Sequence, residues 1–277
     1  MAKGIGLIGN FKGKVGNTVG YKLSASNTGN TQGIRIYQPI VKNPKTSAQA
    51  EQRAKLAPIN ATYRALKMII DRGNEGLPYG NKSRLAWLKQ AFKAETMPWF
   101  VKGAVPTDPV GCRLTKGSLP SVDYSNEMET LEIMVPNLAA GTAVDTIGKL
   151  STALLAGITA LKEGDQLTVV AIYPAANGKV TDVKSIVLDS TSAEAQSFFT
   201  VAEGKVQHEY QDNLRGYSVI VSREGANGEH LRSNESLVIP DAVKAAAPYD
   251  ATSKAAAIES YQNAAGANAD WAEESIQ

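Results

Sequence analysis

The distribution of charge along the chain is the feature that most constrains this protein. Residues 1–50 contain seven basic side chains and no acidic one, and the first carboxylate is Glu51. From the start to Lys93 there are 16 basic and 3 acidic residues, a net charge of +13, whereas the remainder has 13 basic and 24 acidic residues, a net charge of −11. Such a division predicts two surfaces of opposite sign.

Three interpretations fit two such surfaces. The basic part can meet a polyanion such as nucleic acid. It can also meet the acidic part of a neighbouring copy, head to tail, as in a ring or a tube. In the third interpretation the two parts are solvated regions that differ only in composition. The charge pattern alone leaves all three open.

The first part of the chain is rich in glycine and poor in bulky side chains. Eight glycines fall within the first 41 residues, and two runs with β-strand character, 18–23 and 34–40, lie between them. In the second run apolar and polar side chains alternate, which is the period of a half-buried strand. Such a segment buries little area by itself. We therefore expect residues 1–45 to form a basic arm or hairpin that becomes ordered against another surface.

Residues 46–104 have helical periodicity. Apolar side chains recur at helical spacing over residues 48–71, and Pro58 should kink this helix or split it. After a glycine-bounded loop, a second helix with Trp87 on its apolar side is expected. Two helices with a short connection predict an antiparallel helical hairpin.

From residue 105 on, the sequence pattern is typical of β-strands. Runs of strand character are found at 130–135, 166–173, 184–188, 197–201, 216–222 and 236–239. Asn177-Gly178 predicts a hairpin turn. With one short helix at about 153–161, this pattern predicts an immunoglobulin-like antiparallel β-sandwich over residues 105–243, and hence an α+β protein. Residues 244–277 are predicted to be an acidic, alanine-rich tail with a helix near 253–264, mobile unless it docks.

Two glycine motifs suggest nucleotide binding but lack their required context. Residues 4–9 match the pattern GxGxxG, which needs a strand before it and a helix after it, and only three residues precede it here. Gly13-Lys14 is typical of a phosphate-binding loop, but Val15 stands where a serine or threonine would bind magnesium.

The nucleophiles and metal-binding side chains are sparse. His208 and His230 belong to no metal-binding spacing, and Cys112, the single cysteine, has no histidine near it in sequence. We expect Cys112 to be a buried thiol rather than a nucleophile, and it excludes an internal disulfide. No catalytic, cofactor-binding or metal-binding residue is predicted, and we expect a protein that is not an enzyme and that needs no cofactor.

Part of the sequence resembles a known family. The run GKVGNTVG at 13–20, then Arg35, then NPKTSAQAEQR at 43–53 is similar to a protein family of Bacteroidota genomes and of phages and mobile elements of those hosts. The resemblance is specific over residues 8–55, and the C-terminal half is similar only in pattern. That family has no established activity, so no functional residue is carried over. What the resemblance implies is the context of a phage virion component.

These observations together predict a structural protein of a phage head, neck or tail. We expect its N-terminal arm to build a homo-oligomeric ring, tube or shell, with other copies and other virion proteins as its partners. The residues expected at the oligomer interface are Lys14, Tyr21, Arg35, Tyr37, Arg53, Arg64 and Trp87. No membrane partner is expected, because no stretch of about 20 apolar residues occurs, and no small-molecule substrate is expected either. The expected location is the virion, assembled in the host cytoplasm.

Two other functions stay open at this point. Phe11, Tyr21 and Tyr37 are interleaved with basic residues, as a surface that stacks on the bases of a packaged genome would require. A surface adhesin with a glycan-binding sandwich is the second alternative. That alternative needs a secretion route, and the first residues are too short and too glycine-rich for a signal peptide.

Overall fold

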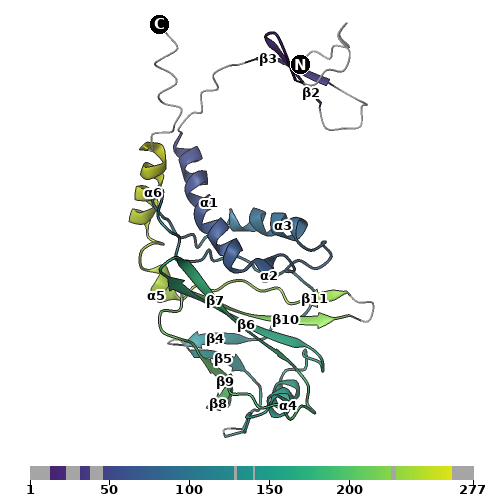
Figure 1. Cartoon of the computed structure of the whole chain (residues 1–277). Helices are drawn as coiled ribbons and strands as arrows, with labels where there is room; N and C mark the ends of the chain where they lie inside the picture. The colour runs from purple at the N-terminus through teal and green to yellow at the C-terminus, as the bar shows by residue number, and fades with distance from the viewer. Residues whose placement is uncertain are drawn as a thin grey trace. The chain divides into compact units, whose positions relative to one another are not determined.

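The computed structural model of the protein describes residues 13–22, 32–37, 46–127, 130–139, 141–225 and 229–263 (Figure 1). The chain divides into two compact units, Met1–Lys45 and Thr46–Gln277. It contains helices and antiparallel sheets in similar proportion, so the protein is of the α+β class.

The first unit holds a three-stranded antiparallel sheet. Its strands, in the order in which they pair, are β1 (Gly13–Val15), β2 (Thr18–Lys22) and β3 (Gln32–Ile36). Gly16 in the turn between β1 and β2 has a φ of +57°, a left-handed conformation that favours glycine. Strand β1 was not predicted from the sequence. The predicted run 34–40 is a strand as far as Ile36, and its residues from 38 on lie outside the described part of the chain.

The second unit begins with a helix that Thr46 caps. Helices α1 (Ser47–Ala65), α2 (Lys67–Ile70) and α3 (Asn81–Ala91) follow one another, and the side-chain oxygen of Thr46 accepts the backbone N–H of Gln49 at 3.4 Å. Of the two outcomes predicted for Pro58, a kink or a split, the split does not occur, because α1 runs through it. The break falls instead at Leu66, where φ is −110°.

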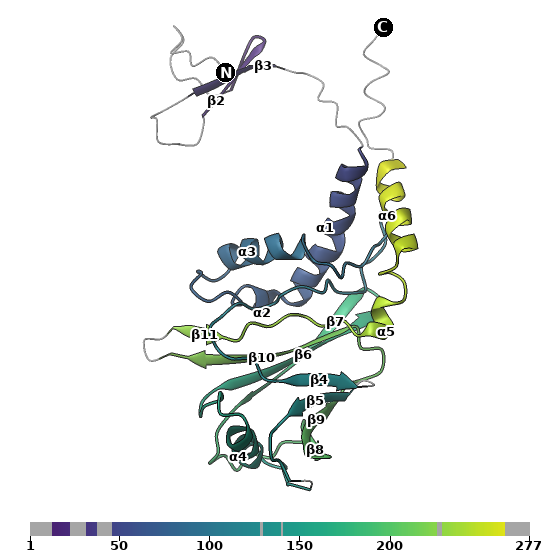
Figure 2. The ribbon, with the colours of Figure 1, turned by 180° about the vertical axis from the view of Figure 1, so that it is seen from behind.

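The helix that lies along α1 is α6 (Ala251–Asn263) (Figures 1 and 2). Ala257 of α6 is fully buried, as are Ala50 and Ala54 of α1. These small side chains let the backbones of α1 and α6 approach closely. The part of the predicted tail that forms α6 is therefore docked against α1. Helix α3 meets only the far end of α1, where the rings of Tyr63 and Trp87 lie 6.1 Å apart. The long partner of α1 therefore comes from the other end of the chain.

Two four-stranded antiparallel sheets make up the rest of the second unit. The middle sheet pairs in the order β11 (His230–Arg232), β10 (Gly216–Glu224), β6 (Gln166–Ala175), β7 (Gly178–Val187). The outer sheet pairs in the order β4 (Tyr124–Glu127), β5 (Thr130–Met134), β9 (Lys205–Glu209), β8 (Thr200–Ala202). Helix α4 (Ile147–Gly157) begins six residues before the predicted one, and α5 (Asp241–Lys244) is a single turn.

Several strand predictions need correction. Strands β4, β9 and β11 were not predicted. Residues 236–239, predicted to be a strand, form only isolated bridges, Arg113 with Ser236 and Tyr217 with Val238. The hairpin expected at Asn177-Gly178 is confirmed, with Ala175 and Gly178 as its closing pair.

The middle sheet is covered on both faces. Val170 and Ile172 of β6 pack with the helices, whereas Val169 and Ala171 of the same strand pack with the outer sheet. Side chains of a strand alternate between its faces, so burial on both sides requires an almost continuous apolar run. The result is three layers, with α1, α2, α3 and α6 on one face of the middle sheet and the outer sheet on the other (Figure 1). The helices and the strands thus share one compact unit.

The docking of α6 can be tested with neighbouring alanines. Ala257→Glu places a carboxylate in the fully buried contact with α1 and should lower the free energy of unfolding by about 2–4 kcal/mol in urea denaturation. Ala256→Glu makes the same change at an exposed position one residue away, and should alter that free energy by no more than about 0.5 kcal/mol. Equal effects of the two variants would show that α6 does not dock as described.

Candidate assembly surfaces

Four of the residues predicted to lie at an oligomer interface belong to the first unit. Lys14 and Arg35 both stand opposite Val19, one on each side, and therefore share a cross-strand row of the small sheet. Tyr21 of β2 stands opposite a glycine of β3. Tyr37 follows β3, is 36% exposed, and donates its backbone N–H to the carbonyl oxygen of Asn17 at 2.6 Å. Phe11, the remaining aromatic residue of the stacking alternative, lies outside the described residues.

The other three predicted residues lie in the second unit, and one of them is misplaced. Arg53 is half-buried and Arg64 exposed on α1, and roughly three helical turns separate them, so they lie on the same face of the helix. Trp87 is only 2% exposed and belongs to the core between the helices and the middle sheet. The prediction for Trp87 is therefore corrected, because its indole ring has no surface left for a neighbouring copy.

Opposite faces of the second unit carry opposite charge. Residues 46–92, which form α1, α2 and α3, contain eight basic and three acidic side chains. Residues 123–165 and 188–212, which form the outer sheet, α4 and their connections, contain twelve acidic and three basic side chains. The middle sheet separates the two regions (Figure 1). We call them the basic helix face and the acidic outer face.

The three acids of the basic helix face are engaged within the chain. A hydrogen bond from Lys55, 3.0 Å away, lowers the pKa of Glu51. Burial opposes ionisation of Asp71, but hydrogen bonds from Lys67 and Tyr63 lower its pKa. These pairings leave the net charge of the face positive.

The third acid is Glu75. Burial opposes its ionisation too, but hydrogen bonds from the backbone N–H and the hydroxyl of Ser118, at 2.9 and 2.8 Å, lower its pKa.

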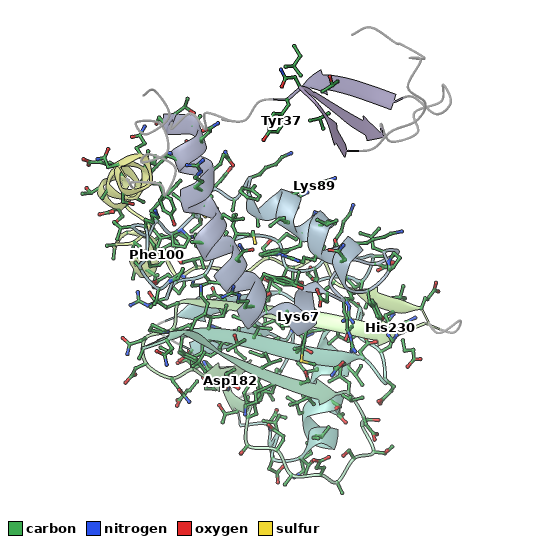
Figure 3. The ribbon with its side chains drawn as sticks, turned by 45° about the horizontal axis from the view of Figure 1, so that its top comes forward. Tyr37, Lys67, Lys89, Phe100, Asp182 and His230 are labelled. Atoms are coloured by element: carbon green, nitrogen blue, oxygen red, sulfur yellow. The ribbon has the colours of Figure 1, made fainter. Side chains whose placement is uncertain are left out.

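In contrast, Arg64, Lys82 and Lys89 have no ion-pair partner among the described residues. Lys89 points away from the sheets (Figure 3).

A cluster of basic and aromatic side chains lies where the α2–α3 connection meets β11. The guanidinium carbon of Arg72 lies 5.6 Å from the ring centre of Tyr79, and the ring of His230 lies 5.6 Å from the same ring. Arg232 donates from Nε to the carbonyl oxygen of Arg72 at 2.8 Å. Tyr79 is 49% exposed, so its ring is accessible to a ligand. We call this cluster the Tyr79 corner, and Figure 3 labels His230 at its edge. The sequence analysis missed it because about 150 residues separate its two halves.

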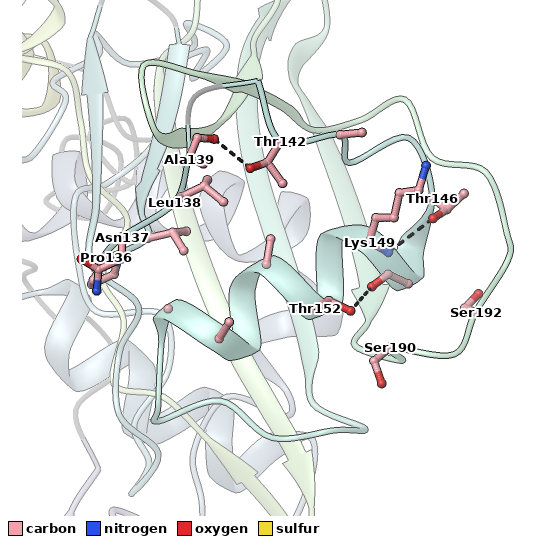
Figure 4. Close-up of a pocket in the computed structure, with 16 residues that line it drawn as sticks. Pro136, Asn137, Leu138, Ala139, Thr142, Thr146, Lys149, Thr152, Ser190 and Ser192 are labelled. Carbon is pink, nitrogen blue, oxygen red and sulfur yellow. Dashed lines mark hydrogen bonds between the residues drawn. The ribbon is translucent and has the colours of Figure 1, made fainter.

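A surface pocket of about 630 Å³ lies beside α4 (Figure 4). Two of its hydroxyl groups bond within the fold: Thr142 donates to the carbonyl oxygen of Ala139, and Thr152 to that of Gly148, both at 2.8 Å. Among the described residues that line it, Lys149 alone is titratable, and it pairs with Asp145 at 2.7 Å. The described residues of the pocket therefore offer no acid–base pair.

The remaining reactive groups are held within the fold. Burial raises the pKa of Cys112 to about 12, so the thiol stays protonated, in line with the predicted buried thiol. His208 stacks on Phe198 with ring centres 3.7 Å apart. Among the residues that the structure describes, no group of three or more histidine, cysteine, aspartate or glutamate side chains is placed to hold a metal ion. No helix in the same residues has the length and apolar character to cross a bilayer.

Comparisons with protein-family models, with curated proteins and with solved structures find no match to this chain. The resemblance over residues 8–55 therefore stays a sequence-based expectation.

The beginning of β7 is anchored by a buried lysine. Lys179 donates from Nζ to the carbonyl oxygen of Asp108 at 2.9 Å, and burial lowers its pKa to about 8 even though Asp108 opposes that shift. Gly178 lies beside Val105 and Pro106 of the same segment. The segment around residues 105–108 therefore covers this end of the strand.

The lowered pKa of Lys179 predicts a pH dependence of stability. Between pH 8 and about 10.5 the unfolded chain binds the lysine proton more tightly than the fold does, so the free energy of unfolding should rise with pH by up to about 3 kcal/mol. Lys179→Met should remove this rise, whereas Lys184→Met, an exposed lysine of the same strand, should keep it. Urea denaturation at pH 7, 8, 9 and 10 measures the slope, and equal slopes for the two variants would contradict the prediction.

Proposed function

We propose that this protein is a structural component of a bacteriophage virion, in the head, neck or tail, that assembles with copies of itself. The basic first unit of one copy would contact the acidic outer face of the next. The observation that carries this proposal is the separation of charge. Residues 1–50 have seven basic side chains and no acid, while residues 123–165 and 188–212 have a net charge of −9, in which the buried Asp165 is neutralised by Arg223. Complementary surfaces on one chain favour head-to-tail association, which closes into rings or grows into tubes.

The order of the strands supports a finer description of the platform that presents the acidic face. The orders β4-β5-β9-β8 and β11-β10-β6-β7 correspond to the orders ABED and GFCC′ of immunoglobulin-like sandwiches. We infer an immunoglobulin-like sandwich with helices packed on its GFCC′ sheet. In this arrangement the ABED sheet remains available to meet a neighbour with its charged surface.

The first unit would act as the arm. It is compact apart from the rest of the chain, and it has edge strands of its own in β1 and β3. A sheet of three short strands buries little area, so pairing or packing against a neighbouring copy would stabilise it. Lys14 and Arg35, in one cross-strand row, are the residues that we expect to face acidic side chains.

The arm's role is tested by removing its charge. Lys14→Glu combined with Arg35→Glu should abolish rings, tubes or large oligomers seen by negative-stain electron microscopy and sedimentation velocity. Lys14→Arg combined with Arg35→Lys keeps the charge and should preserve assembly. Deletion of residues 1–45 should also abolish assembly while leaving the thermal unfolding of the second unit unchanged, because the two units are separately compact. Assembly that survives both the deletion and the charge reversal would refute the proposal.

The Tyr79 corner favours a second candidate function, the binding of nucleic acid. An exposed tyrosine ring beside arginine and histidine side chains fits base stacking together with phosphate contacts. In this function the basic first unit would neutralise phosphates, and the genome rather than another subunit would supply the anionic surface.

Binding of single-stranded DNA in gel shifts tests this candidate. Tyr79→Ala should weaken binding roughly fivefold or more through the loss of stacking, and Tyr79→Phe, which keeps the aromatic ring, should not. If most of the seven N-terminal charges contact phosphate, log affinity should fall against log salt with a slope of about −5 to −6. Absence of binding at low salt would remove this candidate.

A further inference from the structure

The middle sheet ends in one long edge strand, which is exposed at Val180, at residues 183–185 and at Val187. Strand β7 has ten residues and, within the described part of the chain, pairs with β6 alone, whereas the other edge strands of the second unit, β11, β4 and β8, have three or four residues. Val180, Val183 and Val187 of β7 are 55%, 43% and 52% exposed. A long edge with apolar side chains is a template for pairing with another strand unless it is covered or blocked.

The backbone groups of β7 that point away from β6 can be identified. In an antiparallel pair, alternate residues direct both their N–H and their C=O to the same neighbour. Leu188, just after β7, directs both toward the chain that leads into β6: its N–H donates to Asp165 and its C=O accepts from Gly164, each at 2.8 Å. The register between β6 and β7 is uninterrupted, so the residues with even numbers face β6. Thr181, Val183 and Ser185 therefore present their N–H and C=O groups outward.

This outward row is complementary to itself. In a second copy running antiparallel about a twofold axis at Val183, Thr181 stands opposite the partner's Ser185, and Val183 opposite the partner's Val183. Asp182 then stands opposite the partner's Lys184, and the reciprocal pair forms by symmetry. Within one copy these two side chains lie 3.7 Å apart and are 37% and 53% exposed, so both can reach across the edge.

The charges also select the register. The hydrogen-bonding registers on either side of this one place Asp182 against the partner's Asp182, or Lys184 against the partner's Lys184. Like charges directly opposite each other destabilise a strand pair, whereas opposite charges stabilise it. The same two charges would oppose pairing with an unrelated apolar strand. A second copy of this strand, in this register, places an opposite charge against each of the two charged side chains.

We propose that β7 is a homodimerisation edge, at which two copies pair antiparallel through residues 181–185 and join their two middle sheets into one. The paired stretch is short because the segment around Asp108 covers the beginning of the strand. A twofold contact uses the same edge on both copies, so it closes at the dimer and leaves further growth to other surfaces. This dimer rests on the proposed function in one respect: it would be one of the contacts between the self-assembling copies. It involves no residue of the first unit.

Charge exchange across the edge tests the dimer. Sedimentation velocity on the full chain, and on a variant that lacks residues 1–45, measures the dimer dissociation constant. Lys184→Asp or Asp182→Lys alone sets like charges opposite each other twice in each dimer, and should weaken dimerisation about tenfold or more. The double variant Asp182→Lys/Lys184→Asp restores opposite charges and should return the constant to within about threefold of the original. Lys93→Asp, the same charge change at an exposed position off the sheets, should have no such effect.

A second measurement follows the edge directly. Amide hydrogen exchange at Val183 and Ser185 should slow as protein concentration rises through the dimer dissociation constant, and should stay fast in the Lys184→Asp variant. Circular dichroism melting of each variant shows whether the monomer is still folded. A folded chain that remains monomeric at about 100 μM, or a double variant that fails to recover, would overturn the proposal.

The outcomes separate this proposal from the proposed function. Large particles without a β7 dimer would refute the edge and leave the virion assembly role standing. A β7 dimer together with assembly that is unchanged by deletion of residues 1–45 would refute the arm and leave the edge standing.

Discussion

The second unit depends on a sheet that is buried on both of its faces. In β6, Val170 and Ile172 hold the helices, and Val169 and Ala171 hold the outer sheet. Each layer alone would leave an apolar face in water, since the helices and the outer sheet each bury only one side. The hydrophobic contacts of this one strand and its neighbour β10 therefore join the first and last helices of the second unit, α1 and α6, to the two sheets.

The separation of basic and acidic surfaces in the second unit depends on the same three layers. A chain whose early residues are basic and whose later residues are acidic becomes polar in space only if those residues occupy different layers. The middle sheet keeps them apart, and the acids that do occur among the helices are taken up locally, as Asp71 is by Lys67 and Tyr63. What remains is a basic helix face and an acidic outer face on opposite sides of the middle sheet.

Sequence reasoning succeeded where the signal was local. The hairpin at Asn177, the strands β5, β6 and β10, the first helix and the buried Cys112 all followed from short patterns of polarity and turn residues. It failed where long-range packing outweighed local preference. Pro58 lies inside α1 without ending the helix. Trp87 was predicted to lie at an oligomer interface, but its side chain is buried in the core of the second unit. Strands β4 and β9 are short and rich in polar side chains, so their sequences lack an apolar run that would distinguish them from loops.

The amino-acid sequence by itself determined the α+β class, the basic and glycine-rich first unit and the division of charge, because these depend on composition and on short-range periodicity. The tertiary structure alone decided the strand order, the docking of α6 along α1, the Tyr79 corner and the exposure of β7. Each of these joins residues more than about a hundred positions apart or depends on which edge of a sheet the chain leaves uncovered. No local pattern encodes such choices, since they are made by the competition among whole layers to bury apolar surface.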